Sequence, residues 1–469
     1  MSSDNILYRR QFILGDHPIL DFPEWKSIPF GPLHLTVHPD LDTTFVKGTV
    51  GEFLLLGFAL NHYRPEATNK ELMEEMAETC HGFDELLEYS RDLCGRYIIV
   101  YNIPGEIGLL NDLIGSRSVY YYIHQEAIWC ASQPSMLAVL LGIDEDRSPE
   151  VMEYVEKDMF ASGEGCWIGD GTKFIGIKHL LPNHYLDLIS KKSVRYWPTC
   201  PVGNLDLESA SRKSAEILEN TIQSATNRFE MSMAVTSGWD SRCMLAATRK
   251  ISSKVYYYIQ KYGEMTENHP DVTIPKKLAN KLGFPFHTIK CEDYQDDAFD
   301  AMLKRNVFLI HNPEKKVLYR NFFQNFQGKV NASGNISDLG RAIYGIDPVD
   351  DITDLLRLVN LNGSVYAEDS LKDWYAEAKL CCETLGFNLR DLFFWEQVLG
   401  NWGSMFAAEL DIAIDEFYPF GTRRLVETIL AVDERLRPCS NSKVHRRIIE
   451  LLWPELLSEP INPISWRKR

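Results

Sequence analysis

The residues best suited to chemistry lie in one short segment, Met233 to Arg242, with the sequence MAVTSGWDSR. An apolar run ends there in a turn of small and hydroxyl-bearing residues, and a helix is predicted after it. Such a turn directs backbone N–H groups and the positive end of a helix at one point, which suits an anion such as phosphate. The small and hydroxyl-bearing residues of this predicted anion site are Thr236, Ser237, Gly238 and Ser241.

Asp240 gives the segment a second chemical property. A carboxylate repels a bare phosphate, but it is a natural ligand for a Mg²⁺ ion that stands between the two. The segment therefore predicts a phosphate-containing ligand bound together with Mg²⁺. The alternative is an ordinary helix start, in which Thr236, Ser237 and Asp240 cap the first turn.

The elements around this segment alternate between strands and helices, which predicts a doubly wound parallel sheet in an α/β fold. Short strands are predicted at 232–235, 254–260 and 285–289, and helices at 209–229, 240–250 and 271–282. The anion site would then follow a strand at the carboxyl edge of the sheet, where ligands collect in such folds. From residue 298 onward we expect a mainly helical extension.

The first 200 residues have a different pattern, in which turn residues separate short strands. An apolar run covers 51–60, strands are predicted at 95–102, 107–111, 118–124 and 127–131, and helical spacing covers 69–87. This pattern predicts an antiparallel β-sandwich with helices. Two prolines and a glycine in Trp197–Asn204 mark the expected boundary between domains 1–200 and 201–469.

Composition limits the classes of function. With 49 Lys and Arg against 66 Asp and Glu, the net charge is −17, which argues against nucleic acid as the main partner. Residues 1–16 lack the apolar stretch of a secretory signal, and the run Phe53–Leu60 is too short to span a membrane. Ten scattered cysteines without CxxC spacing favour a reducing, cytoplasmic location.

Thr236 to Ser241 resembles the pyrophosphate loop of the asparagine synthetase family and related ATP pyrophosphatases, Ser-Gly-Gly-x-Asp-Ser. Thr236 and Ser237 replace the family's serine and first glycine, and both keep the position small and hydroxyl-bearing. The resemblance implies that this loop binds the pyrophosphate portion of ATP.

A second stretch, Asn331 to Asp338, resembles the family motif Ser-Gly-Glu-Gly-Ala-Asp-Glu. The resemblance implies that Ser333 and Gly334 contribute to the ATP site, and that Asp338 shares Mg²⁺ with the aspartate of the loop. Asn335 and Leu339 replace the two flanking acids of the motif, which argues against aspartate as the substrate. The alternative is an ordinary Gly/Asn/Ser turn before a helix.

Two later stretches are also similar to the family. Asp415 stands where the family has a glutamate before Arg-Val-Pro-Phe, here Phe417–Phe420, and this implies a catalytic acid. Lys443 matches the lysine of the family's Lys-x-x-Leu-Arg element, which implies a cation that stabilises the charge of acyl-adenylate formation. For both residues the alternative is an ordinary polar side chain.

The first half resembles the class II glutamine amidotransferase domain, an Ntn-type fold, through Cys94–Val100, Leu110–Arg117, Trp129–Ser132, Ile177–Tyr185 and Arg195–Trp197. That domain uses a cysteine that Met removal exposes, whereas this chain begins Met1-Ser2-Ser3. The resemblance therefore implies a scaffold without glutaminase activity, with Ser2 as an alternative hydroxyl nucleophile.

Together these resemblances imply an ATP-dependent ligase that activates a carboxylate as acyl-AMP, releases pyrophosphate and forms an amide. The expected nitrogen donor is ammonia, a separate glutaminase or an amine on the substrate. The stretch Ile461–Pro463 is similar to asparagine-synthase-like proteins of bacterial surface-glycan clusters, so the expected carboxylate is a sugar acid, or else a natural-product intermediate. A homodimer is left open.

Three alternatives to this function remain. The first is an intramolecular amide cyclase like the β-lactam synthetases and lasso-peptide cyclases. The second is another nucleotide-dependent transferase, which the cysteine spacing and the acidic charge oppose. The third is a non-catalytic nucleotide-binding relative, which the departures at Ser237, Asn335 and Leu339 favour.

Overall fold

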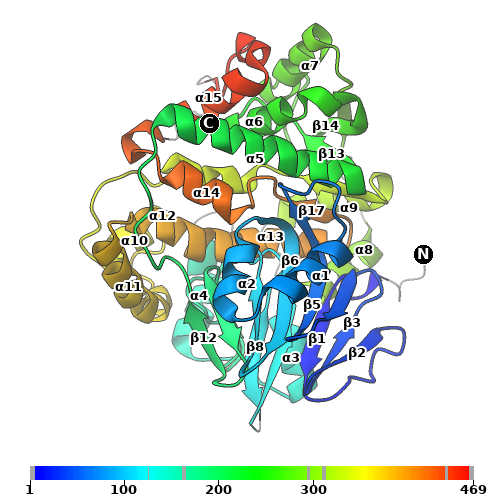
Figure 1. The fold of residues 1–469 in the computed structure, drawn as a ribbon, viewed down its shortest axis with the longest axis vertical. Coiled ribbons are helices and arrows are strands. Elements are labelled where there is room, and N and C mark those ends of the chain that lie inside the picture. Colours follow the sequence, from blue (N-terminus) through cyan, green and yellow to red (C-terminus); the bar gives the residue numbers. More distant parts are fainter. Residues whose placement is uncertain are drawn as a thin grey trace.

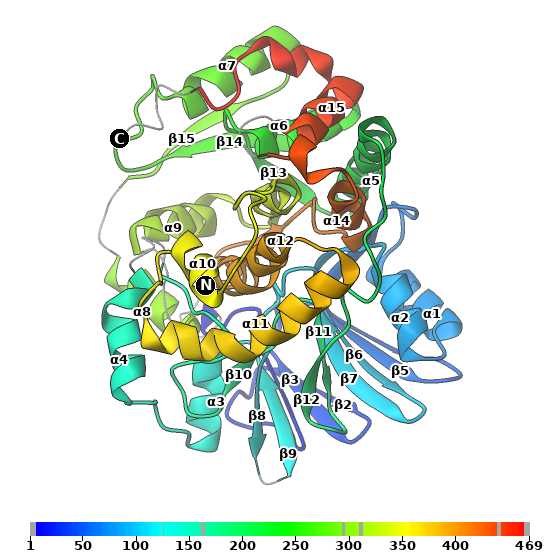
Figure 2. The ribbon, with the colours of Figure 1, turned by 90° about the vertical axis from the view of Figure 1, so that its left-hand side faces the viewer.

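Three β-sheets organise the computed structural model, which describes residues 6–124, 126–160, 165–292, 296–308, 313–438 and 442–463. Two antiparallel sheets lie in the first half of the chain and one parallel sheet lies in the second. Figures 1 and 2 show the parallel sheet and its helices above the antiparallel pair. The α/β fold class predicted from the sequence is confirmed.

The two antiparallel sheets have six strands each. The first runs in the order β10 (Lys178–His179), β8 (Tyr120–His124), β9 (Ala127–Ala131), β1 (Phe12–Gly15), β3 (Leu33–Val37) and β2 (Lys26–Phe30). The second runs in the order β12 (Lys192–Arg195), β11 (His184–Asp187), β7 (Glu106–Asn111), β6 (Leu93–Ile103), β5 (Glu52–Asn61) and β4 (Thr43–Lys47). Their inner faces share one apolar core, to which Leu14 and Leu54 contribute from opposite sides.

Helices cover both outer faces of this sandwich. α1 (Asn69–Thr79) and α2 (Phe83–Ser90) pack on the second sheet, and α3 (Pro134–Leu141) packs on the first. Because side chains of β5 alternate between two buried faces, its sequence is an almost unbroken apolar run. The single helix predicted over 69–87 is two helices in the structure. The backbone is extended at Gly82, which is the N-cap residue of α2.

The parallel sheet has the strand order β15 (His287–Lys290), β14 (Val255–Lys261), β13 (Glu230–Ala234), β16 (Lys329–Ala332) and β17 (Asp415–Phe417). One face packs on α5 (Leu207–Arg228), α6 (Trp239–Ala247), α7 (Pro270–Leu282), α14 (Arg423–Leu430) and α15 (Lys443–Leu452). The other packs on α8 (Asp297–Asn306), α9 (Lys316–Asn325) and residues 408–414, which begin in the last turn of α13 (Ser404–Leu410).

The remaining helices surround these layers. They are α4 (Pro149–Glu156), η2 (Asp158–Phe160), η3 (Arg249–Lys254), η4 (Pro313–Lys315), η5 (Asn335–Arg341), α10 (Ile352–Leu358), α11 (Val365–Leu385), α12 (Leu389–Phe393), the π-helix η6 (Phe394–Gly403), η7 (Glu434–Leu436) and η9 (Pro454–Ser458).

The alternation of strands and helices between residues 207 and 290 is confirmed to within a few residues. The expectation of a mainly helical chain after residue 298 is confirmed for the described residues, although the short strands β16 and β17 also lie there and complete the parallel sheet. The predicted boundary segment, Trp197–Asn204, lies between β12 and α5. Met1, Ser2 and Ser3 lie outside the described residues. In the parts that the structure describes, no helix is both long and apolar enough to cross a membrane.

A buried ion cluster joins the two halves of the chain. Arg96 on β6 contacts Asp411 through both terminal nitrogens, at 2.7 and 2.8 Å, and reaches Asp415 at 3.2 Å. Arg117 lies 3.3 Å from Asp411 and 3.1 Å from Asp415. Both arginine side chains are only 1% exposed. Since Asp415 begins β17, arginines of the first half hold the edge strand of the parallel sheet.

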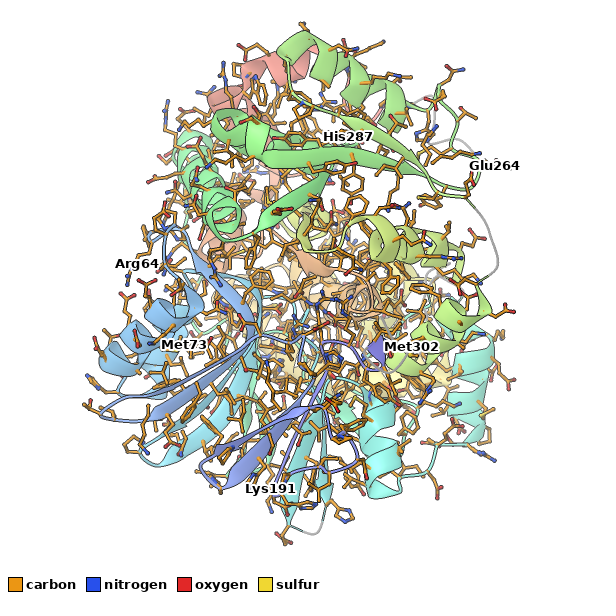
Figure 3. The ribbon with its side chains drawn as sticks, turned by 90° about the vertical axis from the view of Figure 1, so that its right-hand side faces the viewer. Arg64, Met73, Lys191, Glu264, His287 and Met302 are labelled. Carbon is orange, nitrogen blue, oxygen red and sulfur yellow. The ribbon has the colours of Figure 1, made fainter. Side chains whose placement is uncertain are left out.

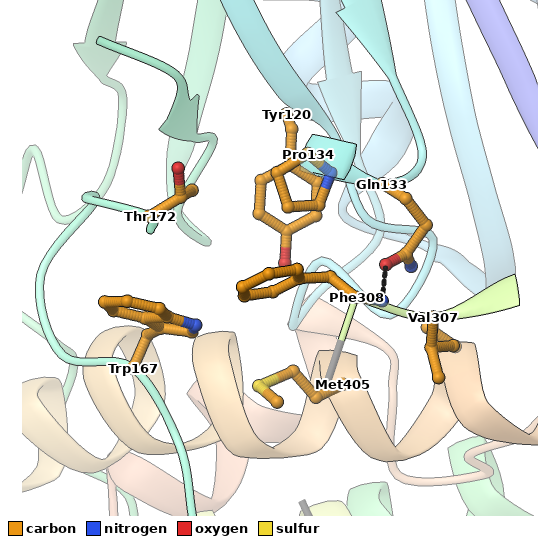
Figure 4. Close-up of a pocket in the computed structure, with 9 residues that line it drawn as sticks. Tyr120, Gln133, Pro134, Trp167, Thr172, Val307, Phe308 and Met405 are labelled. Atoms are coloured by element: carbon orange, nitrogen blue, oxygen red, sulfur yellow. Dashed lines mark hydrogen bonds between the residues drawn. The ribbon is translucent and has the colours of Figure 1, made fainter. Parts of the chain in front are cut away.

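Further ion pairs join the halves, among them Arg91–Glu427 and Arg424–Asp92, and Figure 3 shows side chains filling the region between the upper body, marked by His287, and the lower body, marked by Lys191. A small pocket between them is lined by Tyr120, Trp167 and Phe308 (Figure 4). Its free volume is about 20 Å³, enough for about one water molecule. This pocket is too small for a nucleotide or an amino acid.

Candidate functional site

The predicted anion site is a loop at the carboxyl edge of the parallel sheet, between β13 and α6. The N–H of Val235 still donates to the Tyr258 carbonyl at 2.9 Å, so the loop begins at Thr236. Gly238 is the N-cap of α6, and no side chain of the described residues caps this helix. The first turn of α6 therefore presents backbone N–H groups that suit an anion.

Hydroxyl groups fix the shape of the loop. Ser241 Oγ accepts from the Thr236 N–H at 3.0 Å and lies 2.9 Å from Thr236 Oγ1. The N–H of Gly238 donates to Thr236 Oγ1 at 3.2 Å. Thr236 and Ser241, which the sequence predicts as phosphate-binding residues, thus make hydrogen bonds within the loop.

An acid from the next helix also contacts the loop. Asp271, in the first turn of α7, accepts hydrogen bonds from the N–H and the hydroxyl of Ser237, at 2.8 and 2.6 Å. A carboxylate therefore already satisfies donors that the sequence assigns to phosphate. Sequence reasoning missed this contact, and its only local signal was an acid directly after Pro270 at a helix start.

We expect Asp271→Asn to tighten pyrophosphate binding by roughly tenfold, or about 1.4 kcal/mol. The amide oxygen can still accept the Ser237 hydrogen bonds, but the charge that repels the incoming anion is removed. Isothermal titration calorimetry with pyrophosphate measures the change. Asp206→Asn is the control, because Asp206 caps α5 through the Ser209 N–H at 2.9 Å and is not among the loop contacts. Unchanged or weaker binding by Asp271→Asn would show that this carboxylate does not compete with the anion.

The second motif lies beside the loop. The N–H of Ser333 donates to the Phe417 carbonyl of β17 at 2.8 Å. Gly334 packs directly on α6, since a Cβ at this position would lie 2.8 Å from Asp240 Cβ. The Ser337 hydroxyl donates to Asp240 Oδ1. The structure thus brings Gly334 and Asp338 close to Asp240 of the loop, whereas the contact of Ser333 is with β17.

A basic side chain lies between the two acids. Arg341 Nη1 is 2.8 Å from Asp240 Oδ1 and 2.6 Å from Asp338 Oδ1. The Arg341 side chain is 4% exposed, and those of Asp240 and Asp338 are 29% and 30% exposed. The guanidinium takes the position between the carboxylates that the sequence analysis assigned to Mg²⁺. Sequence reasoning missed Arg341, although its spacing of three residues from Asp338 was visible.

This donor set does not fit Mg²⁺ between the two acids. The ion would need the carboxylate oxygens that now bind Arg341, and its charge would lie beside that of a permanently charged guanidinium. Across the described part of the chain, no group of three or more His, Cys, Asp or Glu side chains could hold a metal ion.

Asp338 and His445, which both lie near Arg341, have shifted pKa values. Burial, and next the neighbouring Asp240, raises the pKa of Asp338 to about 6, against the opposing charge of Arg341. Burial and the charge of the second carboxylate both favour the protonated form of Asp338, and the single charge of Arg341 only partly offsets them. Burial lowers the pKa of His445 to about 4, so this imidazole is neutral at pH 7.

The two predicted catalytic residues have different positions. Lys443 is exposed in the first turn of α15. This helix contacts α6, where Cys243 Sγ donates to the His445 carbonyl at 3.4 Å. Asp415 faces the arginines of the ion cluster instead of the loop. This placement corrects the expectation of a catalytic acid at that position.

Glu416, and not Asp415, points toward the second motif. Its carboxylate accepts from Asn331 Nδ2 at 2.8 Å, and its side chain is buried. Burial raises the pKa of Glu416 to about 7. Successive residues of a strand face opposite sides of the sheet. Asp415 therefore faces the ion cluster, and its neighbour Glu416 faces the second motif.

The last described segment of the chain covers the loop. The N–H of Asn462 donates to the Ser237 carbonyl at 3.1 Å. Buried Arg242 holds the preceding turn by donating to the carbonyls of Leu456 at 2.7 Å and Pro460 at 3.2 Å. Residues 461–463, which the sequence analysis noted only for a resemblance, are therefore part of the site.

No protein-family model and no curated protein matches the chain. Among solved structures, an NH₃-dependent NAD synthetase from Campylobacter jejuni overlaps 42% of this chain and 95% of its own, at 11% identity and a TM-score of 0.23. A glutamine phosphoribosylpyrophosphate amidotransferase from B. subtilis overlaps 64% and 88%, at 10% identity and a TM-score of 0.26. A glutamine-dependent NAD⁺ synthetase from Acinetobacter baumannii overlaps 63% and 66%, at 13% identity and a TM-score of 0.20. Because these TM-scores are low, the overlaps carry no argument about function.

Proposed function

We propose that the chain binds ATP at the loop 236–241 and uses it to form an amide. A substrate carboxylate attacks the α-phosphorus, which gives acyl-AMP and pyrophosphate, and an amine or ammonia then displaces AMP. The observation that carries this proposal is the uncapped start of α6 at the carboxyl edge of a parallel sheet, closed by the second motif at Asp240.

The residues of the chain have separate roles in this proposal. The N–H groups at the start of α6 bind the pyrophosphate portion, while Ser333 and Gly334 close the site beside them. Lys443, at the start of the adjacent helix α15, is the cation proposed to stabilise charge on the α-phosphate side. No step is assigned to Mg²⁺, because Arg341 occupies the place between the acids.

The first half acts as a scaffold in this proposal. Its arginines hold β17 through Asp411 and Asp415, and we assign it no glutaminase role. The nitrogen donor is then ammonia, a separate glutaminase or an amine on the substrate itself. We propose a sugar acid or a natural-product acid as the carboxylate, in keeping with the resemblance noted above.

The products of turnover are expected to be AMP and pyrophosphate. A kinase-type phosphate loop carries a lysine next to Ser or Thr, and no lysine occurs between Thr236 and Ser241. Cleavage at the α-phosphorus also activates a carboxylate, which amide formation needs. ATP–pyrophosphate exchange over a panel of carboxylic acids finds the substrate, and ion-exchange chromatography identifies the nucleotide product. ADP as the sole nucleotide product would refute the proposed reaction.

A second candidate is a nucleotide-binding protein without catalysis. The specific observation in its favour is that Asp271 and Arg341 already satisfy groups that a catalytic site would offer to phosphate and metal. ATP binding without exchange or hydrolysis across the whole acid panel would favour this candidate.

A further inference from the structure

The bridge between Asp240 and Asp338 is built by the fold. Asp240 belongs to α6 and Asp338 to η5, so one guanidinium nitrogen links two motifs that are distant in the sequence. The Ser337 hydroxyl donates to the same oxygen of Asp240 that binds Arg341. That carboxylate oxygen therefore already has two donors.

The backbone around Arg341 is also held in place. Gly340 packs on α14, where an added Cβ would lie 2.7 Å from Ile429 Cγ2. Ala342 ends η5 in the left-handed conformation, with φ 44°. The backbone on both sides of Arg341 is thus held in place, and the buried side chain contacts both acids.

We propose that Arg341 replaces a divalent cation as the charge that bridges the two acidic motifs of this site. The guanidinium is planar and permanently charged, and it donates to both carboxylates at 2.8 and 2.6 Å. A metal ion in the same place would have to displace Arg341 from both oxygens and remain beside its charge. The site therefore excludes Mg²⁺ and Mn²⁺ from between Asp240 and Asp338, whether or not the chain uses ATP.

The consequence for a bound phosphate follows from charge. Two carboxylates without a partner would repel a polyphosphate, and in metal-dependent sites the cation removes that repulsion. Here Arg341 removes part of it permanently, since one positive charge offsets one of the two negative charges. Pyrophosphate binding at the loop is then expected to persist when divalent ions are removed with EDTA.

The test uses Mn²⁺, whose binding electron paramagnetic resonance reports without any nucleotide or turnover. The unchanged protein is expected to bind Mn²⁺ no differently from its Asp338→Asn variant at about 1 mM ion, a concentration at which weak carboxylate sites fill. Arg341→Met uncovers the acid pair and is expected to bind Mn²⁺ at least about tenfold more tightly than the unchanged protein. Arg341→Met combined with Asp338→Asn should lose that gain.

Two outcomes would overturn the proposal. The first is Mn²⁺ binding by the unchanged protein that Asp240→Asn or Asp338→Asn abolishes, which would place the ion between the acids despite Arg341. The second is a folded Arg341→Met variant that binds no additional Mn²⁺. Circular dichroism checks folding, and Arg341→Gln, which retains a hydrogen-bond donor, replaces Arg341→Met if the latter does not fold. Failure of ATP binding alone would count against the proposed function and leave these metal-binding outcomes unaffected.

Discussion

Arg96→Met is expected to lower the free energy of unfolding by about 3–5 kcal/mol, the usual cost of removing one partner from a buried ion pair. The substitution would leave Asp411 without its two-nitrogen contact and Asp415 without one of its partners. Arg117 still lies 3.1 Å from Asp415, but it reaches Asp411 through one nitrogen at 3.3 Å and so does not replace the two-nitrogen contact. Urea denaturation followed by tryptophan fluorescence measures the change.

Arg91→Met is the matched control for this experiment. Arg91 also links the two halves, through Glu427 at 2.6 Å, but its side chain is 34% exposed. Pairs in such positions contribute about 0–1 kcal/mol, because water competes for both partners. If both variants lose the same small amount of stability, the ion cluster does not anchor β17.

Gly334→Ala is expected to weaken ATP or pyrophosphate binding by at least about tenfold. The added methyl group would lie 2.8 Å from Asp240 Cβ and 3.3 Å from the Asp240 carbonyl carbon, so the second motif must move away from α6. Overpacking of this kind costs about 1–3 kcal/mol, and here it also strains the bridge through Arg341. Calorimetric titration of both variants with pyrophosphate gives the affinities.

Gly203→Ala is the matched control, since a Cβ at Gly203 meets nothing within 4 Å. Comparing thermal unfolding of the two variants separates loss of binding from loss of folding. Normal pyrophosphate affinity in a folded Gly334→Ala variant would show that close contact between the two motifs is not needed for binding.

The alternating part of the fold was predictable because its elements are long and periodic. The helix expected over 209–229 is α5, and the strand expected over 254–260 is β14. The strands β16 and β17 were not predictable, since they have four and three residues and carry polar residues such as Asn331 and Glu416. Their strand conformation depends on pairing within the sheet, which local sequence does not report.

The pairing of the loop with the second motif was also predictable, from the resemblance of both stretches. The charged side chains that complete the site were not predictable from the sequence. Asp271 and Arg341 lie outside the short motifs, and their contacts depend on how α7 and η5 are turned toward the loop. Asp415 shows the same limit, because a shift of one residue along a strand decides whether an acid faces the ion cluster or the second motif.

The ion cluster also bears on the order in which the two halves of the chain fold during synthesis. Arg96 and Asp411 are 315 residues apart, so the arginine leaves the ribosome long before its acid partner exists. Domains generally fold from the N-terminus as they are made, so we expect the arginines to be in place on a folded sandwich before Asp411 is made. The last strand of the parallel sheet then arrives at a surface that carries unmatched positive charge. A fragment that begins after the sandwich would have to complete its sheet without that surface.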